Sequence, residues 1–361
     1  MIYLDYQATT PLAPEAREAM LRWLDGPEGT GFGNPHSPHR LGRQAEAAVE
    51  VARERVAALF PPGGTVVFTG SATEALNLAL RGCEPGRAGK PVAVSAIEHS
   101  AVLNTALDLP GDTTILPVDR DGLVDPQVAL PEHVGIVSVM QVNNEIGTIQ
   151  PVADLYERAK AKGALFVCDA VQAAGKMPIA EADLIAISAH KFHGPKGIGA
   201  LWVRDGIALH PAITGGGQEH GLRSGTLSPA LCAGMGAAAQ LARERMAADA
   251  AHAGALWDRA RALLADWQLN GSAEQRYKGN LNLRREGLDV ARLMSDLREV
   301  MFSAGSACAS ESGKPSRILA AIGLTRDQAR GSIRLGFGRY TTIAELEQAV
   351  DMVKRAAVQQ E

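Results

Sequence analysis

Short apolar runs alternate with helix-like segments from about residue 65 to residue 245. The apolar runs predict strands at residues 66–69, 92–97, 113–118, 135–140, 164–168, 184–188 and 198–203. Helical periodicity covers residues 43–59 before these strands, and residues 72–81, 101–107 and 152–162 between them. Strands that are apolar nearly throughout are typical of a sheet covered on both faces. Alternation of strands with helices favours parallel pairing, so we predict an α/β fold with a mostly parallel central sheet.

The pattern changes beyond a long Ala-rich stretch, which predicts a helix from residue 229 towards residue 251. Later segments predict a helix at residues 253–267, a strand at 280–283, a helix at 290–297, a strand at 332–337 and a final helix at 343–356. We interpret this part as a smaller α+β domain. The expected division is a large α/β domain at residues 12–251 and a small domain made of residues 1–11 and 252–361.

The composition is that of an ordinary globular protein of 361 residues, with 46% hydrophobic and 21% charged residues. The net charge of −4 lacks the basic excess of nucleic-acid-binding proteins, so we expect no nucleic-acid partner. No stretch offers the roughly 20 apolar residues of a membrane span, and the first residues do not resemble a secretory signal. Four cysteines in a chain of this length do not indicate a disulfide framework. We therefore expect a cytoplasmic protein without a membrane partner.

Polar residues follow four of the predicted strands. These strand ends carry, in chain order, Glu98 and His99, Asn143 and Asn144, Asp169 and Gln172, and His190 and Lys191. Ligands of open α/β sheets bind beyond the carboxyl ends of the strands. One polar strand end is common at the start of any loop, whereas four at one edge of one sheet indicate a ligand site.

The helix predicted at residues 72–81 begins with the capping-box spacing Ser71-Ala72-Thr73-Glu74, preceded by Gly70. A well-capped helix alone explains this pattern. The alternative is a phosphate site, because the exposed N–H groups and the dipole at a helix N-terminus favour an anion. No Walker-type motif and no Gly-x-Gly-x-x-Gly motif accompanies it, which disfavours nucleoside triphosphate and dinucleotide ligands.

Lys191 is the candidate for covalent chemistry. A lysine just past a buried strand is usually a solvated surface residue, but Lys191 lies among His190, His193 and Lys196 beside a Gly-rich turn. Cationic neighbours and desolvation lower the pKa of a lysine, as a Schiff-base lysine requires. Asp169 caps a helix, forms a structural salt bridge or pairs with a pyridinium nitrogen. The phosphate site, this carboxylate and the lysine together indicate pyridoxal 5′-phosphate (PLP).

The remaining candidates are a thiol and a guanidinium. Cys308 lies among small and polar residues that give no packing reason for a thiol, so it is either a chance loop cysteine or an accessible nucleophile. Arg334 lies on the polar face of the strand at 332–337, where it grips a substrate carboxylate or forms an edge salt bridge. His36 and His39 form a pair at ligand-like spacing, but they lack neighbouring cysteines or carboxylates, so we expect no metal site.

Ordered motifs along nearly the whole chain point to one family. They are Tyr3-Leu4-Asp5-Tyr6-Gln7-Ala8-Thr9-Thr10, Gly31-Phe32-Gly33-Asn34-Pro35, Val142-Asn143-Asn144-Glu145-Ile146-Gly147, Ser188-Ala189-His190-Lys191, Gly215-Gly216-Gly217-Gln218-Glu219, Arg223-Ser224-Gly225-Thr226, Gly305-Ser306-Ala307-Cys308 and Ser332-Ile333-Arg334. The chain resembles the cysteine desulfurases of the class V aminotransferase fold, the type that serves iron–sulfur cluster assembly and nitrogen fixation. The resemblance implies a PLP-dependent transferase fold like that of aspartate aminotransferase. It also implies conversion of L-cysteine to L-alanine, with the sulfur carried as a persulfide on Cys308.

The resemblance implies a role for each matching residue. Lys191 resembles the Schiff-base lysine that moves the Cα proton, His99 the ring-stacking acid–base residue, and Cys308 the nucleophile that attacks the substrate sulfur. The implied cofactor ligands are Asp169, Gln172 and Asn144 at the ring, and Ala72, Thr73, Ser188 and His190 at the phosphate. Asn34 and Arg334 resemble ligands of the substrate carboxylate. Thr226 resembles the residue that reaches the phosphate of the neighbouring subunit, which implies a homodimer.

Some positions depart from the family pattern, and two other functions stay open. Gly70-Ser71 stands where relatives commonly have Ser-Gly, Val171 where they have Ser or Thr, and Ala189 where they have Gly. Housekeeping relatives use a longer C-terminal tail to hand sulfur to a scaffold protein, so the sulfur acceptor is not determined. A PLP-dependent aminotransferase or β-lyase would not need Cys308. A non-catalytic sulfur- or partner-binding protein would need neither Lys191 nor the residues around it.

Overall fold

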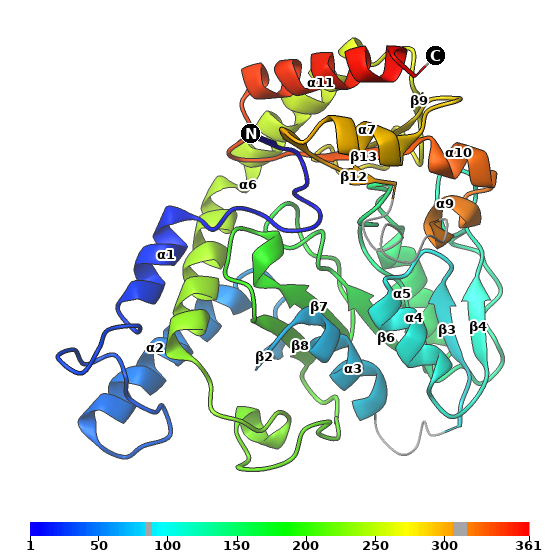
Figure 1. Ribbon diagram of the computed structural model, residues 1–361. Coiled ribbons are helices and arrows are strands. Elements are labelled where there is room, and N and C mark those ends of the chain that lie inside the picture. The colour runs from blue at the N-terminus through cyan, green and yellow to red at the C-terminus, as the bar shows by residue number, and fades with distance from the viewer. Residues whose placement is uncertain (84–88, 306–315, 361) are drawn as a thin grey trace.

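A seven-stranded sheet forms the centre of the protein, for which the computed structural model describes residues 1–83, 89–305 and 316–360 (Figure 1). Its strands are β2 (Gly64–Thr69), β3 (Val92–Ser95), β4 (Thr113–Leu116), β5 (Ile136–Ser138), β6 (Leu165–Asp169), β7 (Leu184–Ser188) and β8 (Gly199–Arg204), in the order β2-β8-β7-β6-β5-β3-β4. Strands β7, β6, β5, β3 and β4 pair in parallel, and β8 is antiparallel to both neighbours. The predicted α/β fold with a mostly parallel sheet is confirmed.

Helices cover both faces of this sheet, because successive side chains of each strand point to opposite faces. In β7, Ile185 and Ile187 pack on one face and Leu184 and Ala186 on the other. The first face is covered by α2 (Arg40–Ala57), α5 (Val152–Ala161) and α6 (Pro229–Leu263), and the second by α3 (Ala72–Gly82) and α4 (Ser100–Leu107). Helix α1 (Pro14–Leu21) packs against α6. Burial on both faces explains the nearly continuous apolar runs in the sequence.

A smaller antiparallel sheet has the strand order β12-β13-β10-β9. It consists of β9 (Gln268–Leu269), β10 (Asn280–Arg284), β12 (Ser303–Ala304) and β13 (Ser332–Gly336), with α7 (Val290–Asp296) and α11 (Ile343–Val358) packed on it. Strand β1 (Ile2–Tyr3) pairs in parallel with β11 (Val300–Met301), which brings the first residues to this sheet. Helices α9 (Arg317–Ala321) and α10 (Arg326–Arg330) lie beside the main sheet's strand ends (Figure 1).

Helix α6 differs from its prediction. The sequence predicted two helices, at 229–251 and 253–267, whereas one helix of 35 residues runs from Pro229 to Leu263. No glycine or proline interrupts residues 237–253, so the backbone continues while its buried face changes partners. Ala238 and Ala242 pack on the main sheet, and Leu256 and Ala260 pack in the core of the smaller sheet. The boundary expected near residue 252 therefore falls inside a continuous helix, and the division into two domains stays a prediction.

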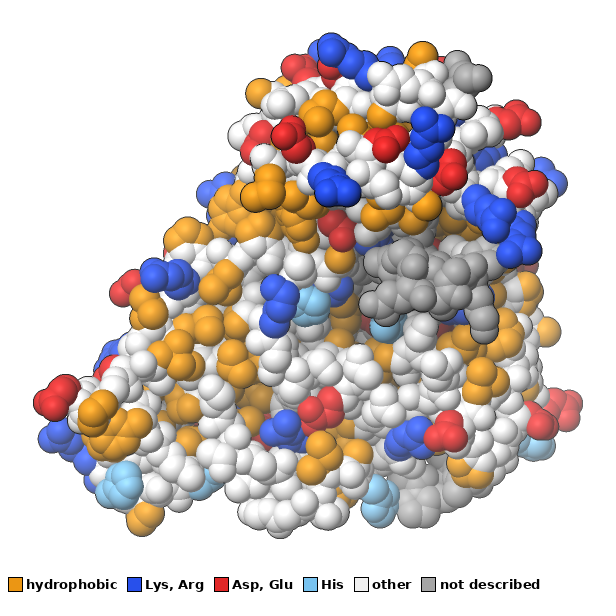
Figure 2. All heavy atoms as spheres, viewed as in Figure 1, with side chains coloured by type: hydrophobic (Ala, Val, Ile, Leu, Met, Phe, Trp, Pro, Cys, Tyr) orange, Lys and Arg blue, Asp and Glu red, His pale blue; other side chains and the backbone are white. Residues whose placement is uncertain are grey.

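The surface mixes charge and apolar side chains. Figure 2 shows acidic and basic side chains interspersed on the face in view, with hydrophobic side chains gathered around α1 and α6 at the left. Leu21 at the end of α1 and Leu24 beyond it are exposed. Within the described part of the chain, no helix combines the length and the apolar character that crossing a membrane requires.

Candidate active site

One cavity of about 300 Å³ collects most of the predicted site residues. Strands β3, β5, β6 and β7 are parallel, so the turns after them meet at one edge of the sheet. The predicted residues that line the cavity are Ala72, Thr73, His99, Asn144, Asp169, Gln172, Ser188, His190, Lys191 and Arg334. Arg334 comes from β13 of the smaller sheet, so the cavity combines residues from both sheets.

Lys191 lies in a short 3-10 helix, η2 (Ala189–Lys191), directly after β7. Its Nζ donates hydrogen bonds to the carbonyl oxygens of Gln7 at 2.7 Å and Ala8 at 2.8 Å. Burial, followed by the charge of Lys191, lowers the pKa of His190 to about 4. Burial also lowers the pKa of His193 to about 4. The prediction that these two histidines surround the lysine with positive charge is therefore wrong near neutral pH.

Asp169 is the last residue of β6, Gln172 follows in the next turn, and both line the same cavity. The Val171 N–H donates to Asp169 Oδ1 at 2.9 Å. Burial raises the pKa of Asp169, against the opposing charge of His99. Gln172 Nε2 donates to the Gln7 carbonyl oxygen at 3.0 Å, so Gln172 and Lys191 share one acceptor. A cationic ring nitrogen beside this buried carboxyl would stabilise its ionised form, which burial disfavours.

His99 is the N-cap residue of α4. Its Nδ1 accepts a hydrogen bond from the Ala101 N–H at 3.1 Å. Because Nδ1 is the acceptor, the proton of the neutral ring lies on Nε2. The first turn of α4 therefore fixes the orientation and the tautomer of this imidazole.

The N-terminus of α3 opens into the cavity through Ala72 and Thr73. Ser71 caps the helix, because its side chain accepts from the Glu74 N–H at 3.2 Å. The predicted capping box is only half formed: Glu74 Oε2 accepts instead from the Gly70 N–H at 2.6 Å, and Glu74 Oε1 pairs with Arg223 Nε at 2.7 Å. The helix end thus offers N–H donors and a favourable dipole to an anion.

Arg334 is 1% exposed, and its guanidinium is held from several sides. Nη2 donates to Asp5 Oδ1 at 2.7 Å and to Ser303 Oγ at 3.1 Å, and Nη1 donates to the Asn144 carbonyl oxygen at 3.0 Å. Among the described residues Nε has no hydrogen-bond partner. A guanidinium carries five N–H donors, so this arrangement leaves donors for a ligand.

Three predicted residues lie elsewhere. Asn34 is exposed and does not line the cavity, and its Oδ1 accepts from the His36 N–H at 2.9 Å. Thr226 is exposed in the loop between β8 and α6 and does not line the cavity of its own chain. Cys308 lies outside the described residues. The roles of all three stay predictions.

Sequence reasoning gave no role to several residues that shape the site. The Gln7 and Ala8 carbonyls and Asp5 belong to the first quoted motif, which was the available signal. Glu98 is fully buried; its Oε1 accepts from Ser95 Oγ at 2.5 Å and from the Met140 N–H at 2.8 Å, and burial raises its pKa to about 8. Glu145 accepts from Ser316 Oγ at 2.5 Å, and burial raises its pKa to about 7.

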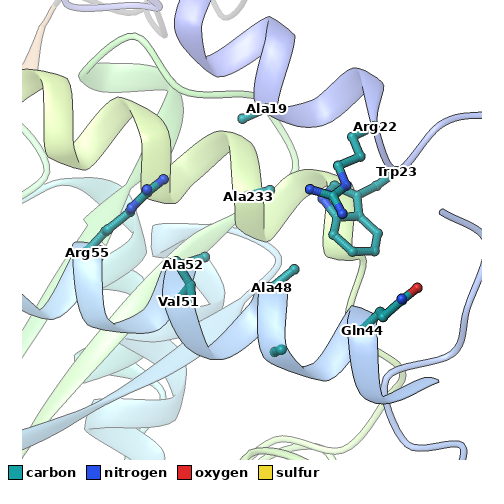
Figure 3. A pocket seen from close by; sticks show the side chains of 10 residues that line it. Ala19, Arg22, Trp23, Gln44, Ala48, Val51, Ala52, Arg55 and Ala233 are labelled. Atoms are coloured by element: carbon teal, nitrogen blue, oxygen red, sulfur yellow. The ribbon is translucent and has the colours of Figure 1, made fainter. Parts of the chain in front are cut away.

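A second hollow has a different character. A groove of about 450 Å³ lies between α1, α2 and α6, as Figure 3 shows. The Arg22 guanidinium lies 5.5 Å from the centroid of the Trp23 ring at one end, and Ala48, Val51 and Ala233 line the groove. None of the predicted site residues lines it.

Comparisons with known proteins agree along almost the whole chain. The sequence model of the family "Aminotransferase class-V" matches residues 2–349. The cysteine desulfurase IscS of Colwellia psychrerythraea is 42% identical over 376 residues, covering 98% of this chain and 92% of that protein. IscS of Rickettsia prowazekii is 40% identical over 372 residues, covering 98% and 90%.

Solved structures are similar to this fold as well. A NifS-like protein superposes with a TM-score of 0.89 at 31% identity, covering 98% of each chain. The structure described as SspA in complex with cysteine gives a TM-score of 0.82 at 32% identity, covering 95% of this chain and 100% of that chain. With these matches and the cavity at the strand ends, this chain belongs to the class V aminotransferase family and, within it, to the cysteine desulfurases.

Proposed function

We propose that this protein is a PLP-dependent cysteine desulfurase, which converts L-cysteine to L-alanine and carries the sulfur as a persulfide on Cys308. The observation that carries the proposal is the single cavity shared by Lys191, Asp169, the N-terminus of α3 and Arg334. A covalent lysine, a ring-nitrogen partner, an anion site and a carboxylate ligand are the groups that PLP chemistry on an amino acid requires.

The residues of the cavity fit PLP. Its volume of about 300 Å³ lies in the range of small-molecule sites. We assign the phosphate to the α3 N-terminus with Ala72, Thr73, Ser188 and His190, and the ring nitrogen to Asp169. Gln172 and Asn144 would face the phenolic oxygen, His99 would stack on the ring, and Lys191 would hold the aldehyde carbon. Burial disfavours the ionised form of Asp169, and a cationic ring nitrogen beside the carboxyl would stabilise that form.

The chain's own residues would then divide the reaction between them. PLP, when bound, supplies the electron sink that makes the substrate Cβ–S bond cleavable. Arg334 binds the cysteine carboxylate, with Asn34 as the second proposed ligand, and Lys191 moves the proton at Cα. The Cys308 thiolate attacks the substrate sulfur, and alanine leaves after proton return.

We further propose that the protein works as a homodimer and passes sulfur to an acceptor or scaffold protein, for iron–sulfur cluster assembly or another sulfur-requiring synthesis. Thr226 is exposed and does not line the cavity of its own chain. This placement supports its proposed contact with the phosphate bound in the neighbouring subunit. The names of the relatives that are called cysteine desulfurase IscS support the proposed sulfur donation.

Cofactor attachment is tested by borohydride reduction. We expect the purified protein to show a visible absorption band that borohydride bleaches, with the pyridoxyl group then found on Lys191 by peptide mapping. Location of the group on Lys162 or Lys196 would contradict the assignment of Lys191.

The desulfurase function is tested with Cys308→Ala, using Cys83→Ala as the matched control. Cys83 is a half-buried thiol whose Sγ donates to the Ala79 carbonyl oxygen at 2.9 Å, away from the cavity. We expect Cys308→Ala to keep PLP and to change its spectrum with cysteine, yet to release almost no alanine and to carry no persulfide. Wild-type alanine release by Cys308→Ala would instead favour an aminotransferase or β-lyase.

A further inference from the structure

A second lysine lies behind the proposed cofactor site. Lys176 is partly buried, and its Nζ donates to Gln172 Oε1 at 3.0 Å. It does not line the 300 Å³ cavity, but it shares a separate cavity of about 30 Å³ with Lys191. Lys176 therefore contacts a residue of the proposed site without touching the space that a ligand would occupy.

The turn after β6 fixes the position of Lys176. The Lys176 N–H donates to the Ala173 carbonyl oxygen at 3.0 Å, and Gly175 before it has a φ of +71°, a conformation that favours glycine. The Lys176 Nζ lies 5.2 Å from the centroid of the Tyr277 ring, which favours the ammonium form. Burial, followed by the charge of Lys191, opposes that form and lowers the pKa of Lys176 to about 7. Both forms keep N–H groups, so the hydrogen bond to Gln172 persists.

This contact determines which end of the Gln172 amide faces which neighbour. An ammonium donates and cannot accept, so in its charged form, which the Tyr277 ring favours, Lys176 requires the amide oxygen on its own side. Gln172 Nε2 then donates one N–H to the Gln7 carbonyl oxygen at 3.0 Å and keeps a second N–H. In the flipped orientation, Nε2 would face the Lys176 donor and Oε1 would face the Gln7 carbonyl oxygen, which are two unfavourable contacts.

We propose that Lys176 is a positioning residue that fixes the amide of Gln172, so that the cavity receives an N–H donor from this side chain rather than a carbonyl oxygen. The inference rests on the proposed function, in which Gln172 faces the phenolic oxygen of PLP. Its consequence is selectivity: the site favours a ring that carries a hydrogen-bond-accepting oxygen at this position. Lys176 acts entirely through Gln172 and contacts neither substrate nor cofactor.

The first test measures PLP binding by the apoprotein rather than turnover. Lys176→Met removes the donor with little change in size, and Lys176→Arg keeps a donor-only cation. Loss of one oriented hydrogen bond to a charged ligand group should weaken PLP binding on the order of tenfold in Lys176→Met. The visible band of the bound cofactor should also shift, with both effects largely restored in Lys176→Arg. Lys162→Met, at an exposed lysine, should match the wild type.

The second test is a double-mutant cycle with Gln172→Leu, accompanied by thermal unfolding of each variant. If Lys176 acts through Gln172, then Lys176→Met should cause little further loss of PLP affinity in the Gln172→Leu background. Fully additive losses, or a Lys176→Met protein with wild-type affinity and spectrum, would overturn the inference. Neither result would touch the proposed function, which fails only if the wild type does not bind PLP at Lys191 or does not form alanine from cysteine.

Discussion

Arg334 is the residue whose surroundings define its role most sharply. Asp5 and Ser303 hold Nη2, the Asn144 carbonyl holds Nη1, and the side chain is almost completely buried. The guanidinium therefore keeps one orientation before any substrate arrives, which lowers the entropy that binding must remove. A lysine would place a point charge on a flexible stem there, without the planar set of N–H donors that binds a carboxylate through two hydrogen bonds.

We predict that Arg334→Ala weakens cysteine binding while PLP stays bound. Loss of one partner of a desolvated charge pair costs roughly 2–5 kcal/mol, so the KM for cysteine should rise by at least an order of magnitude. Asp5→Asn should raise KM less, because it removes only the support of the guanidinium. Steady-state kinetics and the cofactor spectrum check both variants, with exposed Asp205→Asn as the control. An unchanged KM in Arg334→Ala would exclude the role.

Site residues were predictable from the sequence wherever they directly follow a strand. The strand-end rule places His99, Asn144, Asp169 and Lys191 at one edge without knowledge of any partner, and they line one cavity. Asp5 was not predictable in this way, because its partner Arg334 lies 329 positions away and neither neighbourhood refers to the other. For Arg334 the sequence left a carboxylate grip and an edge-strand salt bridge as alternatives; the structure shows a salt bridge to Asp5, but β13 lies between β12 and β10 and is not an edge strand.

At the scale of elements, strand prediction succeeded because of burial. Strand β7 has the predicted bounds of residues 184–188, since each of its side chains is buried and the strand is apolar almost throughout. Helices α9 and α10 were not predicted, because five residues are too few to display a helical period. Helix α1 was not predicted, because its single buried residue, Ala16, gives no apolar stripe. The continuity of α6 was missed because residues 243–252 carry no buried side chain, between a part of the helix that packs on the main sheet and a part that packs in the core of the smaller sheet.

Helix α11 offers a test of stability without a test of chemistry. Thr342 and Glu345 form a complete capping box: Thr342 Oγ1 accepts from the Glu345 N–H at 3.1 Å, and Glu345 Oε2 accepts from the Thr342 N–H at 2.9 Å. We predict that Thr342→Ala lowers the free energy of unfolding by about 1 kcal/mol. Thr342→Ser, which keeps the hydroxyl, should stay close to wild type. Denaturant unfolding measures both, and loss of catalytic activity in Thr342→Ala at low temperature would contradict this purely structural role.

At the scale of the whole molecule, buried carboxyls couple folding to pH. Burial raises the pKa of Glu98 from 4.5 to about 8, so between these values the folded protein holds a proton that the unfolded chain releases. The contribution of Glu98 to the free energy of unfolding is therefore fully present below pH 4.5 and is lost as the pH rises through 8. Burial lowers the pKa of Lys176 from 10.5 to about 7, so the unfolded chain binds a proton that the folded protein lacks between these values. The contribution of Lys176 to the free energy of unfolding therefore rises with pH above 7.

We predict that Glu98→Gln removes the contribution of Glu98 while leaving that of Lys176 in place. Between pH 6.5 and 8.5, the wild-type holoenzyme should therefore lose more stability, or gain less, than Glu98→Gln. Thermal unfolding at the two pH values gives this difference directly. Identical changes in the two proteins would mean that Glu98 has the same protonation state when folded and unfolded.

The proposed dimer predicts complementation between two defective chains. If Thr226 serves the cavity of the neighbouring subunit, a mixed dimer of Lys191→Ala and Thr226→Ala chains contains one intact site, because the Lys191→Ala chain donates its normal Thr226. Mixing the two variants under conditions of subunit exchange should therefore restore alanine formation that neither shows alone at low PLP. If verified mixed dimers do not regain alanine formation, Thr226 serves the site of its own chain or no site at all.

The first ten residues have a further consequence for how the protein is made. Gln7 and Ala8 offer carbonyls to Lys191, Gln7 also donates to the Gly279 carbonyl oxygen, and Asp5 holds Arg334. On the ribosome, this segment is synthesised before its partners, which follow up to 329 codons later. A nascent chain has Lys191 long before it has Arg334 and the strand that carries it. The proposed grip on cysteine is thus completed only after Arg334 has been made, so products of synthesis that stalls before this residue do not expose a finished site.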